Sequence, residues 1–331
     1  MIVSMNGLTL SRKYYEAYGK PMLAKFPQLE KEFAVGLVGR GSECFGFDDE
    51  ISRDHDFGPS FCIWLRREIY EQYAGEVQAA YDAMPREFMG FSGRNMEESG
   101  TGRVGVLCIE DFYYGILGMD HVPVSYQEWL ALQDENLATA TNGEVFEDRL
   151  GVFTGIREGL LSYYPEDVRI KKIVARMARA ARAGQYNYAR AMFRGERVAA
   201  ELFLHEFIKE VMSLVYLLNK KYAPFTKWLH KGMKTLPTCA EIADMINLFY
   251  QIQEPEAAWA QITSKDATFL NTNDGRVLII EAICNIIVQV LQEQGLSTAE
   301  DNFLQSHLRS VTERIQDGAI RNMQYLDGGA L

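Results

Sequence analysis

The residues best suited to chemistry lie in one stretch, 36–57, with the sequence GLVGRGSECFGFDDEISRDHDF. Within it, Gly41 and Ser42 follow a short apolar run that is typical of a buried strand. Glycines after a strand let the chain turn tightly and aim backbone N–H groups at a phosphate, and a serine hydroxyl adds another donor. The loop therefore predicts a phosphate-binding site.

Two acids, Asp54 and Asp56, end the same stretch. If they lie on a strand, side chains at positions i and i+2 point to the same face and lie close together. Such a pair can hold magnesium against a triphosphate, an arrangement that phosphoryl-type transfer requires. The alternative interpretation is a solvated acidic turn, because Asp48–Glu50 lies nearby.

Gly-Ser followed by a spaced Asp-x-Asp pair resembles the motif of the nucleotidyltransferase superfamily, which includes the antibiotic nucleotidyltransferases and the DNA polymerase beta-like enzymes. The longer strings GLVGRGSECFGFDDEISRDHDFGP and NKKYAPFTKWL are similar to an uncharacterised bacterial branch, the DUF4037 proteins. The resemblance spans residues 30–240. It implies that Gly41 and Ser42 hold the β- and γ-phosphates of ATP or another NTP, while Asp54 and Asp56 coordinate Mg²⁺ and carry catalysis. An acceptor hydroxyl would then attack the α-phosphate and release pyrophosphate.

Two residues of the second half are candidates through the same resemblance. Related nucleotidyltransferases commonly bring a lysine and a tyrosine of the helical domain to the triphosphate or base, which implies nucleotide binding by Tyr222 and Lys227. The alternative for Lys227 is an ordinary surface lysine beside a core residue, Trp228.

The strand expected to carry a third acid departs from the family pattern. Active members usually have this acid on a neighbouring strand, and here the sequence Arg103-Val104-Gly105-Val106 places a glycine, Gly105, at that position. Glu110 and Asp111 lie too far along the chain or have the wrong parity to replace it. Glu97 or Glu98, in the preceding loop, is the remaining alternative. The gap weakens the expectation of catalysis more than that of nucleotide binding.

Composition restricts the class of partner. The net charge of -11 and the pI near 5.1 argue against a general nucleic-acid binder. However, the segment 169–197 holds nine lysines and arginines and one acid, Glu196. It is either a wall facing a triphosphate or phosphorylated substrate, or a solvated helix face paired with an acidic N-terminal domain.

Periodicity predicts an α+β protein: a small nucleotidyltransferase-like α/β domain at 1–125, with a mixed sheet and flanking helices, followed by an all-helical bundle domain at 126–331. Strands are predicted at 33–38, 56–65 and 104–109, where the last contains Gly105. Helices are predicted at 11–26, 66–84, 198–219, 238–252, 276–294 and 298–317. Beyond about residue 125 the strand signals fade.

The leading hypothesis is a cytoplasmic, Mg²⁺-dependent nucleotidyltransferase that moves a nucleoside monophosphate from an NTP, with ATP favoured, to a small-molecule acceptor. An RNA end stays open as the acceptor. No membrane span and no signal peptide are expected. The first alternative is a catalytically degenerate nucleotide-binding sensor or regulatory protein that lacks the third acid. The second is a helical interaction module for which the α/β part is only a scaffold.

Overall fold

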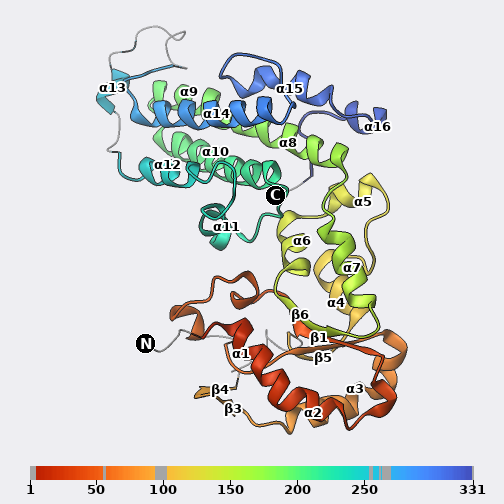
Figure 1. Cartoon of the computed structure of the whole chain (residues 1–331). Helices are drawn as coiled ribbons and strands as arrows, with labels where there is room; N and C mark the ends of the chain where they lie inside the picture. The colour runs from red at the N-terminus through yellow and green to blue at the C-terminus, as the bar shows by residue number, and fades with distance from the viewer. Residues whose placement is uncertain are drawn as a thin grey trace. The chain divides into compact units, whose positions relative to one another are not determined.

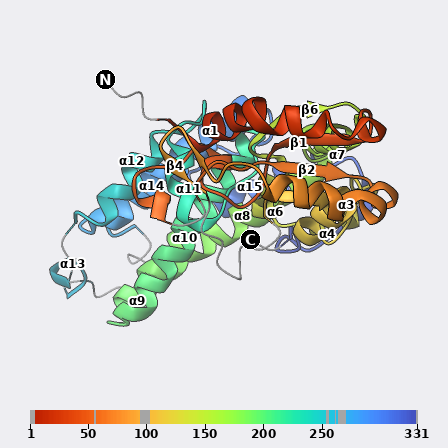
Figure 2. The same ribbon diagram turned by 90° about the horizontal axis from the view of Figure 1, so that it is seen from below.

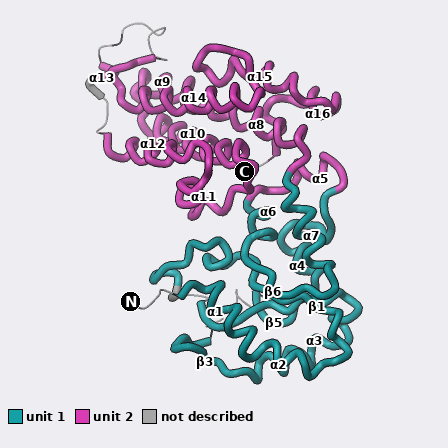
Figure 3. Tube along the Cα trace, viewed as in Figure 1, with its two compact units in different colours: residues 1–123, 135–163 teal, residues 124–134, 164–331 magenta. Residues whose placement is uncertain are grey.

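The computed structural model describes residues 5–54, 57–93, 103–252, 256–260, 262 and 270–329. The chain divides into two compact units, shown in Figure 3. Unit 1 comprises Met1–Pro123 and Glu135–Tyr163, and unit 2 comprises Val124–Asp134 and Tyr164–Leu331. The chain therefore leaves unit 1, contributes a short segment to unit 2, and returns to unit 1 before it enters unit 2 for good.

Unit 1 is built on a four-stranded mixed sheet with the order β5-β2-β1-β6. Its strands are β1 (Phe33–Leu37), β2 (Cys62–Leu65), β5 (Gly105–Cys108) and β6 (Glu144–Asp148). β1 is antiparallel to both of its neighbours, β2 and β6, whereas β2 and β5 are parallel. Figure 2 shows β1 between β6 and β2. The α+β class with a small mixed sheet is thus confirmed.

Helices cover both faces of this sheet (Figure 1). Phe33 and Val35 of β1 belong to one core cluster with Ile63 of β2, and helices α1, α2 and α3 contribute to the same cluster. The next residue of β2, Trp64, points the other way, since side chains alternate along a strand. Its ring stacks on Phe153 of α7 with 4.0 Å between centroids. The central strands are therefore buried on both faces.

The remaining elements of unit 1 are mostly helices, and α1 begins after Asn6, whose side chain accepts a hydrogen bond from Thr9 N. The π-helix η1 joins α1 to α2. The elements are α1 (Gly7–Tyr14), η1 (Tyr15–Gly19), α2 (Lys20–Leu23), η2 (Pro27–Leu29), η3 (Glu43–Phe45), η4 (Ile51–Asp54), α3 (Arg67–Asp82), the hairpin β3 (Glu87–Phe88) and β4 (Phe91–Ser92), α4 (Ile109–Leu117), α6 (Asp134–Thr141, whose first residue belongs to unit 2) and α7 (Val152–Leu161).

Two strand predictions differ from the structure. The second strand starts at Cys62 rather than at residue 56, because Gly58 has a φ of +153° and Pro59 lacks the N–H that a strand would donate. The fourth strand, β6, lies beyond the expected domain boundary at 125/126, in a region where no strand was predicted. Unit 1 consequently extends to Tyr163.

The described part of unit 2 is helical, as expected. α8 packs against α10 and α15, and the π-helix η6 continues α8 and packs against α10 and α14. Gly184 of η6 permits this close packing, because a Cβ there would come within 2.4 Å of the Phe207 ring. The helices are α5 (Tyr126–Ala131), α8 (Glu166–Ala180), η6 (Ala181–Tyr188), α9 (Ala189–Phe193), α10 (Arg197–Leu218), α11 (Thr226–Met233), α12 (Ile242–Phe249), α13 (Glu256–Ala260), α14 (Gly275–Glu293), α15 (Leu304–Thr312) and α16 (Gly318–Arg321).

Helix α14 is long and apolar enough to cross a membrane by length and composition alone. The core helix of a protein without membrane spans passes the same test, and 56% of the apolar window is buried inside unit 2. Ile283, Cys284 and Ile287 are fully buried there. The helix is therefore weak evidence for a membrane span.

Candidate functional site

The predicted phosphate loop follows β1, and a distant segment holds it in place. Gly39 donates its N–H to Asn142 Oδ1 at 2.9 Å, and the Asn142 amide returns a hydrogen bond to Gly39 O at 2.7 Å. Gly143 N donates to Cys44 O at 2.7 Å. Residues 142–143 thus form hydrogen bonds with the loop on both sides of Gly41 and Ser42, at Gly39 and at Cys44.

Close backbone packing explains the glycines around these hydrogen bonds. A Cβ at Gly143, whose φ is +62°, would lie 2.0 Å from Leu37 O, and one at Gly36 would lie 2.3 Å from Glu144 O. No side chain fits at such distances. The end of β1 and the start of β6 are therefore pressed together, and this fixes where the loop begins.

Gly41 and Ser42 are half-buried and lead directly into the 3-10 turn η3. The side chain of Glu43 folds back over Gly41, so that a Cβ added at Gly41 would lie 2.4 Å from Glu43 Oε1. A Cβ at Gly7 would meet the other end of the same side chain, 2.5 Å from Glu43 Cβ. As a result the side chain of Glu43 is only 4% exposed, and a buried carboxylate lies against the predicted phosphate loop.

Asp48 and Asp49 have structural roles. Asp48 Oδ2 accepts a hydrogen bond from Gly7 N at 2.8 Å, at the start of α1. Asp49 Oδ1 accepts from Ser52 N at 2.9 Å, and Ser52 Oγ accepts from Asp49 N at 2.7 Å. These reciprocal bonds favour the 3-10 turn η4 that follows.

The carboxylate pair falls largely outside the described residues. Asp54 is described by its backbone only, as the last residue of η4, and Asp56 lies outside the described residues. The expectation that both acids share one face of a strand is wrong for Asp54, because that residue ends a 3-10 turn well before β2 begins at Cys62. The hydrogen bonds between Asp49 and Ser52 support this turn.

The position expected for a third acid is Gly105, the first residue of β5, paired with Cys62 in the parallel ladder. Its φ is +93°, and the place of a side chain is filled by Gln78, whose Oε1 would be 2.6 Å from an added Cβ. The same Oε1 accepts a hydrogen bond from Val106 N at 2.8 Å. An acid at this position would need both a different backbone conformation and a displaced Gln78.

The neighbouring acids do not replace it. Glu110 Oε2 accepts a hydrogen bond from Arg67 N at 3.0 Å, and Asp111 forms an ion pair with the Arg67 guanidinium at 2.5 Å. Both acids lie in the first turn of α4, where they complement the helix dipole. Glu97 and Glu98 lie outside the described residues.

Tyr222 and Lys227 belong to unit 2. The ring of Tyr222 packs edge-on against Tyr164 with centroids 5.2 Å apart, and burial together with the nearby Asp134 carboxylate raises the pKa of Tyr222 well above its usual range. Lys227, in the first turn of α11, is exposed and lies 5.2 Å above the Trp228 ring. Lys227 is therefore accessible to an anion, whereas Tyr222 is held in a packed aromatic pair.

The sequence analysis did not predict a role for two aromatic residues of the loop region. The half-buried rings of Phe45 and Phe47 are parallel within 2°, with centroids 6.3 Å apart. Parallel rings next to a phosphate loop offer a surface on which a nucleobase can stack. The spacing F-x-F after Gly-Ser could have indicated the aromatic pair. The turn dipeptide Asn142-Gly143 could have indicated the segment that holds the loop.

One carboxylate, that of Glu43, lies against the loop. Among the described residues, no group of three or more His, Cys, Asp or Glu side chains is placed to hold a metal ion. Nevertheless, the space left by the missing side chain of Gly41 is taken by the Glu43 carboxylate. A triphosphate brought to this loop would meet that negative charge, and a cation between the two would remove the repulsion. Carboxylate oxygens are ligands that Mg²⁺ accepts.

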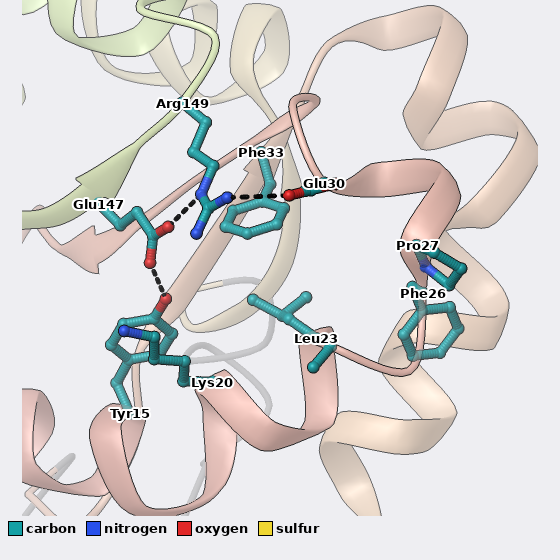
Figure 4. A pocket seen from close by; sticks show the side chains of 10 residues that line it. Tyr15, Lys20, Leu23, Phe26, Pro27, Glu30, Phe33, Glu147 and Arg149 are labelled. Carbon is teal, nitrogen blue, oxygen red and sulfur yellow. Dashed lines mark hydrogen bonds and ion pairs between the residues drawn. The ribbon is translucent and has the colours of Figure 1, made fainter.

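A separate pocket of about 270 Å³ opens in unit 1 (Figure 4). Its lining includes no residue of the segment 36–57. Its floor is apolar, with Leu23 and Phe33, and its polar side is a chain of contacts: Tyr15 donates to Glu147, which pairs with Arg149. Because these polar groups already satisfy one another, the pocket does not replace the loop as the phosphate-binding candidate.

Comparison with known families concerns the middle of the chain. Residues 129–229 match the family described as "Domain of unknown function (DUF4037)". The resemblance to DUF4037 proteins is confirmed over this segment, which contains Tyr222 and Lys227. The loop with Gly41 and Ser42 lies outside the matched residues.

The comparisons with individual proteins add little. No curated protein matches the chain. A crystal structure of a "nucleotidyltransferase-like protein" from Exiguobacterium sibiricum 255-15 is similar at 10% sequence identity, covering 90% of this chain and 89% of that chain. Its TM-score of 0.32 is too low for the likeness to carry an argument about fold or function.

Proposed function

We propose that the chain is a Mg²⁺-dependent nucleotidyltransferase that moves a nucleoside monophosphate from ATP, or another NTP, to a small-molecule acceptor. The observation that carries the proposal is the loop at Gly41 and Ser42, which follows a fully buried strand and is gripped by Asn142. A loop held in place by Asn142 and Gly143 presents backbone N–H groups at little further entropic cost, and this is what phosphate binding requires.

Four groups have assigned roles in this proposal. Gly41 and Ser42 hold the β- and γ-phosphates, and Asp54 and Asp56 hold Mg²⁺, which neutralises charge on the triphosphate. The parallel rings of Phe45 and Phe47 lie in the same loop region and support a base-stacking role. Lys227 and Tyr222 stay candidates for nucleotide binding.

A second function is favoured by one specific observation, namely Gly105. The place of the third acid is taken by Gln78, so no carboxylate of the described residues lies there to help deprotonate an acceptor. A protein with this loop and without the third acid would bind nucleotide as a sensor or regulatory subunit and release no pyrophosphate.

The test compares the melting temperature with and without ATP and Mg²⁺ for wild type and for Asp54→Ala/Asp56→Ala. A ligand at a concentration of 100 Kd adds about 2.7 kcal/mol to stability, so the wild-type transition should rise by several degrees. The double variant should lose this rise. The matched control is Glu50→Ala, which removes an exposed acid of the same segment and should keep it.

Pyrophosphate release over a panel of acceptors separates the two functions. Release by wild type supports the transferase. A thermal shift without release for any acceptor supports the sensor. If none of the four nucleoside triphosphates shifts the transition, both nucleotide functions are wrong.

A further inference from the structure

Four of the nine cations of the basic segment 169–197 are buried inside unit 2, which neither interpretation of the segment expected. The buried cations of α8 are Arg169, Lys171, Lys172 and Arg176. Two of them meet buried acids: Lys172 pairs with Asp134 at 3.0 Å, and Arg176 pairs with Glu210 at 3.4 Å. These two are structural ion pairs.

Lys171 is different, since its hydrogen-bond partners are backbone oxygens. Its side chain is fully buried, and its Nζ donates to the carbonyls of Met323, at 3.1 Å, and Gln324. Further along the same helix, Arg179 donates to Leu326 O at 2.8 Å. Among the described residues, the C-terminal segment thus supplies the hydrogen-bond acceptors of both cations.

We call Met323–Gly329 the C-terminal strap. Its end lies directly on α8, because a Cβ at Gly328 would come within 2.4 Å of Ala175 Cβ and 2.9 Å of Lys171 O. Gly329 has a φ of +83°, and a Cβ there would lie 3.3 Å from Lys172 Nζ. Glycine is therefore needed at both positions for the strap to lie flat on the helix.

The strap is attached mainly by its backbone. Four consecutive residues, Gln324–Asp327, are exposed, and of these Tyr325 and Leu326 keep more than half of their surface covered, at 40% and 41% exposure. Burial lowers the pKa of Lys171, and the Asp327 carboxylate on the strap acts against this shift. Lys171 and Arg179 therefore contact neutral carbonyl oxygens of the strap, and its Asp327 carboxylate is a nearby negative charge for Lys171.

Carbonyl oxygens carry no net charge, so on the strap only the Asp327 carboxylate offsets the charge of the buried Lys171 ammonium. Hydrogen bonds to an anionic oxygen are about twice as strong as neutral ones. A phosphate group that replaced the strap would satisfy the same donors and also compensate their charge. The strap therefore stands where an anionic ligand would bind more favourably.

We propose that the C-terminal strap is a displaceable cover over an anion-binding face of α8, where Lys171 and Arg179 bind the phosphate groups of a polyphosphate-bearing ligand once the strap is lifted. All of these residues belong to unit 2, so the proposal does not depend on the loop at Gly41. Either one can fail while the other holds.

The first test is calorimetric titration with inorganic tripolyphosphate at low ionic strength. A variant that ends at Asn322 should bind at least tenfold more tightly than the full chain. Lys171→Met/Arg179→Met in the shortened chain should abolish the gain. Equal binding by the full and shortened chains overturns the proposal, and so does a gain that survives the double substitution.

The second test keeps the chain at full length. Gly328→Val should push the strap off α8 and reproduce the gain in binding, whereas Gly318→Val, at a glycine with open space around it, should not. If both the shortened chain and Gly328→Val lose a cooperative thermal transition, the strap is a permanent part of the fold and the proposal is wrong.

Proteolysis of the wild-type chain reports the displacement directly. Trypsin cleaves after Arg321, just before the strap, and mass spectrometry detects the released peptide 322–331. Tripolyphosphate should speed this release several-fold, because ligand and strap compete for the same donors. An unchanged or slower release overturns the competition.

Discussion

Lys172 and Asp134 form a buried ion pair in unit 2, with Nζ 3.0 Å from Oδ1. Tyr164 donates its hydroxyl to the same oxygen at 2.6 Å, and Tyr222 packs against the Tyr164 ring. The other carboxylate oxygen, Oδ2, is buried and accepts no hydrogen bond from the described residues. One carboxylate therefore anchors α8 and supports the residue that the sequence singled out for nucleotide binding.

Asp134→Asn should destabilise unit 2 strongly, because it leaves the Lys172 ammonium buried without a counter-charge. Breaking a buried pair in this way typically costs about 3–5 kcal/mol. Urea unfolding followed by circular dichroism measures the change. Asp134→Asn/Lys172→Met should recover much of the loss, and a double variant as unstable as the single one would show that charge is not the cause.

The pKa of Asp134 also predicts how the stability of the fold depends on pH. Burial alone would raise the pKa of Asp134, but the Lys172 charge and the Tyr164 hydroxyl outweigh it, and the pKa falls below the usual 3.8. A carboxyl with a lowered pKa stabilises the fold fully above its unfolded value, and this stability is lost as the pH falls through the folded value. The melting temperature of wild type should drop below about pH 4 more steeply than that of Asp134→Asn. Parallel curves would contradict this assignment.

Gly143→Ala should destabilise unit 1 and loosen the loop. The added Cβ would lie 2.0 Å from Leu37 O at a φ of +62°, so we expect a loss of about 1–3 kcal/mol. The rise in melting temperature with ATP and Mg²⁺ should shrink as well. The matched control is Gly155→Ala in α7, where the space is open, and this change should stabilise by about 0.5–1 kcal/mol. Equal effects of the two substitutions would contradict the close packing.

Glu43→Gln tests the carboxylate that lies over Gly41. If this charge helps to hold a cation at the loop, its loss should raise the Mg²⁺ concentration needed for half of the ATP-induced thermal shift by about tenfold. Glutamine keeps the size of the side chain, so the packing against Gly7 should survive. Glu50→Gln serves as the exposed control. An unchanged Mg²⁺ requirement for Glu43→Gln would leave the carboxylate with a packing role alone.

Regular periodicity carried most of the fold prediction. α3, α10 and α14 lie within a residue or two of their predicted bounds, and β1 and β5 are also close. These elements are specified by apolar residues near in sequence. β6 was missed because Glu144–Asp148 is a half-exposed edge strand with three acids and no apolar run.

The candidate site was predictable only in part, for a related reason. The turn after β1 follows from its own glycines, and the sequence placed it correctly. The burial of Glu43 depends on Gly7 of α1, and the grip on Gly39 depends on Asn142. The end of η4 at Asp54 depends on the bonds between Asp49 and Ser52. Contacts between distant residues do not show in local spacing.

β6 is the last strand of the sheet in the sequence, and this position affects both synthesis on the ribosome and the behaviour of shortened chains. β1 pairs with β2 on one edge and with β6 on the other, so the sheet cannot close until the ribosome has released the chain through Asp148. Until then the open edge of β1 is a template for pairing with other chains. A recombinant fragment cut at residue 125 would keep that edge permanently open and should aggregate, whereas a fragment through Tyr163 contains every strand of the sheet.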